Sequence, residues 1–198
     1  MNAGSAFRGE RVNPRENVRS NMVDGAVVLL ATQGVEGTSF KEVLGVANAP
    51  RGSVYHHFPG GKSELLHAAL DRASGRALEA MEATRGLSAL EVLERFLSLW
   101  RGLLDYSHLR AGCAVVSVTV SGPEDDILAH VGAIFRSWTE QLAALFVAGG
   151  MAEDAAHTIA TVTIAATEGA VVLSRAEQSR APFDEVGNTL KDLVRGRA

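Results

Sequence analysis

The sequence contains 198 residues, of which 46% are hydrophobic and 21% charged, a composition that excludes disordered, collagen-like and membrane-embedded proteins. The single cysteine, Cys113, excludes an internal disulfide framework and a four-cysteine zinc site. The net charge of −4 is unevenly divided, because residues 1–62 hold seven Lys and Arg against five Asp and Glu, whereas residues 63–198 hold twelve against eighteen. The N-terminal third, at +2, is therefore the part whose charge permits binding to nucleic acid.

No stretch of the sequence has the run of apolar residues that a membrane-spanning helix needs. The least charged segments, such as 111–120 and 159–166, are shorter than the roughly 18 consecutive apolar residues required. The first seventeen residues mix charges with turn formers and contain no apolar segment of a signal peptide. We therefore expect a cytoplasmic protein with one large domain or two small ones.

The N-terminal third predicts four helices. The five prolines of the chain fall where helical periodicity stops, which indicates an all-α fold. Gly34 is expected to end the first helix, and a capping box formed by Ser39 and Glu42 begins the second. The expected helices of this third cover residues 15–32, 39–49, 50–58 and 62–81.

The remaining two thirds predict longer and more apolar helices. Residues 87–106 are polar on one side and broadly apolar on the other, which indicates a helix near the centre of the fold. Residues 113–120 favour a strand by propensity, because five of the eight are β-branched, but no other segment offers a strand partner. We interpret them as a short buried helix. Further helices are expected over 125–147, 152–176 and 183–194, which makes about nine in all.

Two short helices joined by a tight turn have the proportions of a helix-turn-helix, whose second helix enters the major groove of DNA. The sequence reads TSFKEV over 38–43, RGSVYHHF over 51–58 and KSELL over 62–66. This ordered set closely resembles the N-terminal signature of the TetR family of transcriptional repressors, and residues 49–62 are most similar to its lincomycin-resistance and flavonoid-responsive branch. The resemblance covers residues 15–66, and beyond them the chain matches mainly in the number and length of helices.

The resemblance implies DNA contacts for residues on both sides of the turn. Ser39 caps the second helix and Lys41 lies on its first turn, where backbone amides and a cation meet phosphate. Arg51 and Ser53 begin the third helix and reach base edges, arginine with the bidentate geometry that suits guanine. Gly52 fits a close approach of the backbone to DNA. Phosphate contacts are expected from Tyr55, His57 and Lys62, and His56 is a further candidate for facing the DNA.

Other interpretations compete for some of these residues. Phe58 is expected in the core, and Tyr55 belongs either to that core or to the DNA-facing surface. The adjacent pair His56 and His57 lacks the i, i+4 spacing of helical metal ligands, and no Cys, Asp or Glu cluster stands nearby in the sequence. We therefore expect no metal site.

The predicted organisation has three parts. They are a flexible N-terminal arm over residues 1–14, a helix-turn-helix DNA-binding domain over 15–61, and a ligand-binding and dimerisation domain over 62–198. Basic residues of the N-terminus, such as Arg8 and Arg11, either reach the minor groove or form a solvated tail, and we favour the tail.

By the resemblance, the last two helices of each subunit join in a four-helix bundle, and a two-fold dimer implies a palindromic operator. A ridge of small residues on the helix over 152–176 suits the close approach of a partner helix. The alternative is that these residues only reflect the helix propensity of alanine. The residues predicted at the dimer interface are Ala156, Ala160, Thr163, Thr167, Ala170 and Leu190.

The resemblance places an effector pocket among the middle helices. Aromatic walls with a few hydroxyl groups suit a flat, mostly apolar effector, and the few charges of this region disfavour a strongly charged one. For each residue taken alone, packing in the core is an equally good interpretation. The residues predicted to line the pocket are Phe96, Trp100, Cys113, Ser117, Phe135, Trp138 and Thr161, with His130 and His157 as further polar candidates.

The sequence offers little support for an enzyme. Gly61, Lys62 and Ser63 match the end of a phosphate-binding P-loop, but His56 stands where the first glycine of that motif is required. No nucleophile elbow or metalloprotease motif is present in the sequence. We therefore expect no catalytic activity and no cofactor.

The expected function is that of a ligand-responsive homodimeric regulator, a repressor by family analogy. A small effector releases it from a palindromic operator by shifting the population of its conformations, with the fourth helix as the lever. The alternative is a helical ligand-binding or interaction protein that no longer reads specific DNA.

Overall fold

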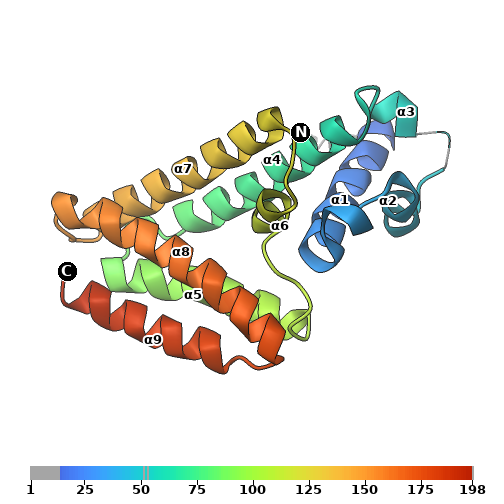
Figure 1. Ribbon diagram of the computed structural model, residues 1–198. Helices are drawn as coiled ribbons and strands as arrows, with labels where there is room; N and C mark the ends of the chain where they lie inside the picture. The colour runs from blue at the N-terminus through green and yellow to red at the C-terminus, as the bar shows by residue number, and fades with distance from the viewer. Residues whose placement is uncertain (1–13, 51, 53, 198) are drawn as a thin grey trace, which may run out of the picture.

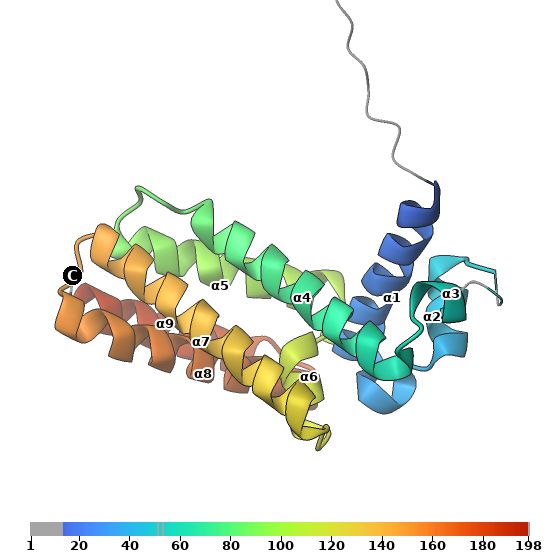
Figure 2. The ribbon, with the colours of Figure 1, turned by 90° about the horizontal axis from the view of Figure 1, so that it is seen from above.

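The polypeptide forms an elongated molecule in which three helices gather at one end of a longer helical body (Figure 1). The computed structural model describes residues 14–50, 52 and 54–197. Within these residues it contains nine α-helices and no strand, which confirms the expected all-α fold. We call the first three helices the N-terminal cluster and the other six the helical body, and Figure 2 shows the same division from above.

The first helix, α1 (Pro14–Gly37), is bent at a glycine. Its buried side chains follow the predicted spacing and include Met22, Ala26 and Leu30. Gly34 adopts a φ of 77°, a left-handed conformation that glycine takes at little cost. The predicted helix stop is thus a kink, after which the helix resumes for a final turn before Thr38.

The second helix, α2 (Phe40–Ala47), begins as the sequence predicts. The Ser39 hydroxyl accepts a hydrogen bond from the Glu42 amide at 3.2 Å, which is the serine half of the expected capping box. Asn48 ends the helix in the left-handed conformation, with a φ of 48°, and its amide donates to the Gly45 and Leu44 carbonyls. The turn is therefore closed by local hydrogen bonds.

The third helix, α3 (Val54–His57), is a single α-helical turn and is shorter than the predicted segment 50–58. Gly52 lies in a short 3-10 turn before it. Pro50 has no amide hydrogen and glycine is a poor helix former, so both residues disfavour an earlier start of the α-helix. The i to i+4 hydrogen bond of this turn runs from the Phe58 amide to the Val54 carbonyl at 2.8 Å.

The fourth helix, α4 (Gly61–Glu82), connects the N-terminal cluster to the helical body. Its first half buries Leu65, Ala69 and Leu70, and its second half buries Ser74 and Met81. It packs against α1 and against helices of the body, as both views of the ribbon show. A displacement of α4 therefore reaches both parts of the molecule.

The middle of the body contains α5 (Ala89–Tyr106), α6 (Ala114–Val120) and α7 (Asp125–Ala148). A complete capping box between Ser88 and Glu91 begins α5. The prediction that residues 113–120 form a buried helix is confirmed, since Val115 and Val118 of α6 are fully buried. This short helix packs against α1, and the Gly112 amide just before it donates to the Ala31 carbonyl at 2.8 Å.

The body ends with α8 (Glu153–Glu177) and α9 (Ala181–Arg195), which pack against each other. By length and composition alone α8 qualifies as a membrane span, with a mean hydropathy of 1.4 in its most apolar window, although it contains no long uninterrupted run of apolar residues. In this fold 44% of that window is buried. Core helices of water-soluble proteins pass the same test, so the apolarity of α8 is weak evidence for a membrane.

Candidate functional site

The exposed side of the N-terminal cluster carries the side chains that the sequence predicts to meet DNA. Tyr55 is 76% exposed, and its ring tilts against Phe40 with centroids 6.2 Å apart. His56 is exposed as well, whereas Val54 and Phe58 on the other side of the same turn are 2% and 0% exposed. Phe58 is thus a core residue, as expected, while Tyr55 belongs to the surface.

The start of α2 lies close to Tyr55. Lys41 is exposed on the first turn of α2, next to the Ser39 cap, and Lys41 and Tyr55 border the same open hollow between α2 and α3. Gly52 is exposed, and a Cβ atom there would meet no other atom within 4 Å. No packing within the described chain therefore requires a glycine at position 52, which leaves room for a backbone approach from outside.

Four further predictions for this surface have different outcomes. Arg51 and Ser53 lie outside the residues that the structure describes. Lys62 is exposed, but its ammonium group donates to the Val35 carbonyl at 2.9 Å and so ties the start of α4 to the end of α1. His57 is half-buried, with its ring edge-on to that of His56 at 5.3 Å.

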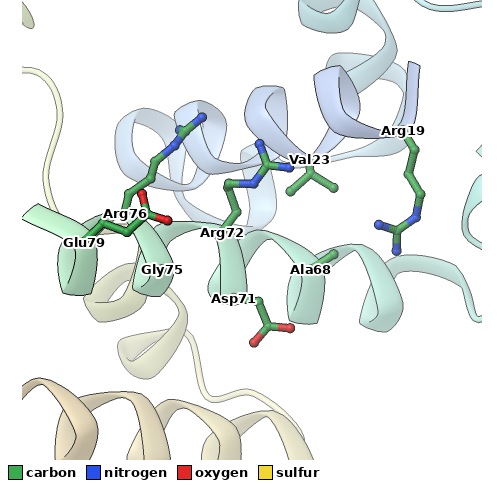
Figure 3. Close-up of a pocket in the computed structure, with 8 residues that line it drawn as sticks. All are labelled: Arg19, Val23, Ala68, Asp71, Arg72, Gly75, Arg76 and Glu79. Atoms are coloured by element: carbon green, nitrogen blue, oxygen red, sulfur yellow. The ribbon is translucent and has the colours of Figure 1, made fainter. Parts of the chain in front are cut away.

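A groove between α1 and α4 contains an ion-pair cluster that the sequence analysis did not identify. Figure 3 shows Arg72 and Arg76 of α4 extending toward α1. Both guanidinium groups donate to the Oδ1 atom of Asp24, at 2.6 and 2.7 Å, and Arg72 also donates to the Ser20 hydroxyl at 3.1 Å. Two features of the sequence point to this cluster. The two arginines are spaced i, i+4, and Asp24 is the only acidic residue within 17–35 of the first helix.

An apolar cavity of about 240 Å³, which we call the body cavity, lies among α4, α5, α7 and α8. Phe96 and Trp138 in its wall are 9% and 5% exposed, and Trp100 is half-buried. The Trp138 indole donates to the Ser74 hydroxyl at 3.2 Å, so its polar edge is satisfied within the chain. The residues lining the cavity are Arg76, Ala77, Ala80, Met81, Phe96, Leu99, Trp100, Leu103, Trp138, Ile164 and Glu168.

A second cavity of about 420 Å³, the junction cavity, lies where the end of α1 meets α6 and α8. The predicted residues Cys113 and Ser117 line this cavity and not the body cavity. Glu168 lines both cavities. The structure therefore divides the predicted pocket between two spaces that share one carboxyl group.

Glu168 is the residue of this region that the sequence analysis missed. Its side chain is 9% exposed, and removal from water raises the pKa of this carboxyl to about 7. The neighbouring Cys113 thiol acts in the opposite direction, and burial together with Glu168 raises the pKa of the thiol itself. The signal was present in the sequence, since Glu168 is the only charged residue within 158–174.

Comparisons with known proteins agree with this geometry at both ends of the chain. Residues 22–69 match the model of bacterial regulatory proteins of the tetR family. Residues 89–189, half of the chain, match the C-terminal domain of LmrA/YxaF-like transcriptional regulators. The chain belongs to the TetR family of transcriptional regulators. The suggested resemblance, including its LmrA-like branch, is thereby confirmed.

Individual TetR-family relatives match over most of their length. The HTH-type transcriptional regulator Rv0196 of Mycobacterium tuberculosis is 34% identical over 89% of this chain and 93% of its own. LmrA of Bacillus subtilis is 24% identical, over 89% of this chain and 96% of its own. The crystal structure of regulatory protein TetR from Rhodobacter sphaeroides has the same fold, with a TM-score of 0.78 at 21% identity over 88% of this chain and 97% of its own. TetR-family members are transcriptional regulators and not enzymes.

Two predicted effector residues of this TetR-family chain lie away from both cavities. Phe135 is half-buried, and its ring packs edge-on against Trp138 at 5.5 Å, behind the cavity wall. Thr161 is exposed on α8, where its hydroxyl donates to the His157 carbonyl. Of the further candidates, His157 is also exposed, and His130 pairs with Asp71 of α4 at 2.9 Å.

The predicted dimer residues need a correction, because they face the interior of their own chain. All six are at most 2% exposed in the single subunit, so a partner chain has no access to them. Small side chains let α8 pack closely against α7 and α9 of the same chain, and the pattern alone does not distinguish this from packing between subunits. The residues concerned are Ala156, Ala160, Thr163, Thr167, Ala170 and Leu190.

The opposite side of α8 is apolar and exposed. Val162, Val172 and Leu173 are 40%, 52% and 50% exposed, and Ala165 and Gly169 lie on the same side of the helix. These five residues recur at helical spacing, and we call them the outer α8 stripe. The stripe is a contiguous apolar surface on one of the two helices that the family resemblance assigns to dimerisation.

Proposed function

We propose that this TetR-family chain is a homodimeric repressor that a small, mostly apolar or aromatic effector releases from a palindromic operator. The observation that supports this function best is the position of Arg76. Its side chain lines the body cavity and also donates to Asp24 of α1 at 2.7 Å. One residue thus lies at the proposed effector site and at the contact with the proposed DNA-binding domain. Family membership implies a cytoplasmic regulator, and we extend that to this chain.

The proposed DNA surface is the exposed side of the N-terminal cluster. Lys41 and Tyr55 contact phosphates there, with the Ser39 cap and the amides of the first turn of α2 beside them. Arg51 and Ser53, which the family resemblance places at base edges, supply sequence preference. The positive charge of residues 1–62, at +2 in a chain of −4, supports this orientation toward DNA.

Release follows from the connection between α4 and α1. An effector that fills the body cavity contacts Arg76, whose guanidinium group holds Asp24 together with that of Arg72. If the effector binds better when α4 is displaced, it must weaken DNA binding by the same differential free energy, typically about 1–3 kcal/mol. The junction cavity offers a second connection, because its walls include the end of α1 and helix α8.

A gel shift tests DNA recognition. Purified protein is titrated against DNA from upstream of its own and neighbouring genes, at two salt concentrations. We expect a saturable complex that weakens with salt and that loses sequence preference in Arg51→Ala, because a bidentate guanine contact is worth about 1–3 kcal/mol of discrimination. Arg95→Ala, at an exposed arginine of α5 in the body, is the matched control.

A complex that is indifferent to sequence and to Arg51, or the absence of a complex, contradicts the repressor and leaves a helical ligand-binding protein that no longer reads specific DNA.

Dimerisation is tested at the outer α8 stripe. We expect Leu173→Asp to shift the protein from dimer to monomer in sedimentation equilibrium, because it places a charge in the middle of an apolar contact. The matched control is Leu128→Asp on α7, which changes a leucine of similar exposure, 46%. A dimer that survives Leu173→Asp rules out the outer α8 stripe as the interface.

A further inference from the structure

We propose that the effector of this protein is an aromatic amine whose ammonium group pairs with Glu168 while its ring lies among the aromatic side chains of the body cavity. The inference rests on the proposed function, since it names the chemical class of the effector. It also revises the expectation that the pocket disfavours charge.

The Glu168 carboxyl group is buried and only partly hydrogen-bonded by the described residues. The residue is 9% exposed, and its Oε1 atom has no hydrogen-bond partner among the described residues. A buried carboxyl oxygen without a donor is energetically unfavourable, and native structures retain few such groups. Because this oxygen belongs to a residue that lines the body cavity, a bound molecule is in a position to supply the donor.

The other groups on the cavity walls indicate the charge that this donor carries. The cationic groups on the walls of the two cavities are Arg76 and Arg175. Arg76 is already paired with Asp24, and the Arg175 guanidinium group lies against Gly112. No ion pair joins Glu168 to a described residue, and the neighbour that hydrogen-bonds its carboxyl is the neutral thiol of Cys113. An ammonium group would supply both a donor and a compensating charge in a water-poor site, where a charge-assisted hydrogen bond is roughly twice as strong as a neutral one. An anionic ligand would instead be repelled.

The volume and lining of the body cavity indicate the rest of the ligand. Phe96, Trp100 and Trp138 contribute aromatic surface, which favours an aromatic ring and also attracts a cation through the negative faces of the rings. The volume of about 240 Å³ lies below the range of about 300–1,000 Å³ typical of drug-sized ligands. A ligand with one ring or two fused rings and a short amine chain therefore fits.

Calorimetric titration of the full-length protein tests the proposal with three probes of nearly equal size. They are phenethylamine, phenethyl alcohol and hydrocinnamate, which carry an ammonium group, a hydroxyl group and a carboxylate on the same ring and chain. We expect the amine to bind about tenfold more tightly than the alcohol, and the carboxylate to bind most weakly. In Glu168→Gln the amine and the alcohol should bind about equally tightly, because the amide side chain is neutral.

Two further variants separate the role of the charge from the stability of the fold. Glu177→Gln, at an exposed glutamate of the same helix, is expected to keep the tenfold preference. Glu168→Asp retains a carboxylate and is expected to bind all three probes more weakly but still to prefer the amine.

Three results overturn the proposal. They are equal or tighter binding of the alcohol, an unchanged preference in Glu168→Gln, and no binding of the amine at millimolar concentration. The gel shift on the same preparations distinguishes this failure from that of the proposed function. Sequence-specific DNA binding without amine preference removes only the effector class, whereas amine preference without DNA binding removes only the repressor.

Discussion

The N-terminal cluster and the helical body present their functional side chains in opposite ways. Lys41 and Tyr55, proposed to contact DNA, are exposed on short helices and need little beyond their own helix to be placed. Phe96, Trp138 and Glu168 are at most 9% exposed and come from three helices that are far apart in the sequence. A surface site therefore depends on local order, whereas a cavity depends on the assembly of the whole body.

The two regions also differ in the environment of their charged groups. In the N-terminal cluster Lys41 lies at the surface, where solvent and salt screen its charge, and it suits a reversible contact with phosphate. In the body a single carboxyl group is withdrawn from water, and this raises its pKa to about 7. The same residue type in an exposed position, such as Glu91 beside Ser88, has a lowered pKa because the serine hydroxyl and amide donate to it.

The largest expected effect is a loss of folding stability when a buried aromatic ring of the body is removed, compared with removal of an exposed ring of the N-terminal cluster. Phe146→Ala removes a ring that is 0% exposed in the body, and we expect the free energy of unfolding to fall by about 3–5 kcal/mol. Tyr55→Ala, at a 76% exposed ring, should change it by less than about 0.5 kcal/mol while weakening DNA binding. Urea unfolding followed by circular dichroism measures the first quantity and a gel shift the second. Equal destabilisation by both variants would contradict the contrast between the two regions.

The second prediction concerns pH. The folded chain keeps the Glu168 proton up to about pH 7, whereas an ordinary glutamate loses it near 4.5. Because the folded state binds more protons between these values, Glu168 lowers the free energy of unfolding as the pH rises through this window, in total by on the order of 3 kcal/mol. Below about pH 4.5 the carboxyl is protonated in both states and does not lower the free energy of unfolding, whereas above about pH 7 the full loss of stability is present.

Glu168→Gln tests this dependence. Relative to the unmodified protein, the variant should gain stability as the pH rises from about 5 to about 8, because it lacks the proton-linked penalty. Urea unfolding at the two pH values measures the difference, with Glu177→Gln as the exposed control. A constant difference between Glu168→Gln and the unmodified protein would show that the carboxyl does not titrate in this window.

The third prediction sharpens the assignment of the DNA surface. The sequence has three lysines, of which Lys41 lies in the N-terminal cluster, Lys62 at the start of α4 and Lys191 on α9. We expect Lys41→Ala to weaken DNA binding to all sequences alike and to reduce the slope of log affinity against log salt by about 1, because one phosphate contact is lost. Lys191→Ala should leave the slope unchanged. A smaller slope in the Lys191 variant would place DNA on the body as well.

The smallest expected effects compare two helix caps. Ser39→Ala and Ser88→Ala each remove a hydroxyl that accepts a hydrogen bond from a helix amide, and each should lower the free energy of unfolding by about 1 kcal/mol. Only Ser39→Ala should also weaken DNA binding, since Ser88 caps α5 of the helical body and not a helix of the proposed DNA surface. Denaturant unfolding and gel shifts of the two variants check this, and equal DNA affinity would reduce Ser39 to a purely structural cap.

Much of the fold was predictable because helical periodicity is a local property. The boundaries of α2, α4 and α7 lie within about two residues of those predicted, and α6 is a helix despite its β-branched composition. The length of α3 was not predicted, because the motif pattern does not record that the proline and glycine before Val54 are poor helix formers. The aromatic residues of the body cavity were identified, but Thr161 lies on the outside of α8, since one helical turn contains residues of every orientation.

The sequence by itself determined the all-α fold, the family and the residues proposed to contact DNA, because each depends on local spacing and on the order of a short motif. Only the tertiary structure decided which side of α8 faces its own core, that Arg76 reaches both Asp24 and the body cavity, and that Glu168 is buried with an unpaired oxygen. Burial and partner choice depend on which helices pack together, and no local pattern encodes that Arg76 pairs with Asp24 or that it lines the same cavity as Glu168.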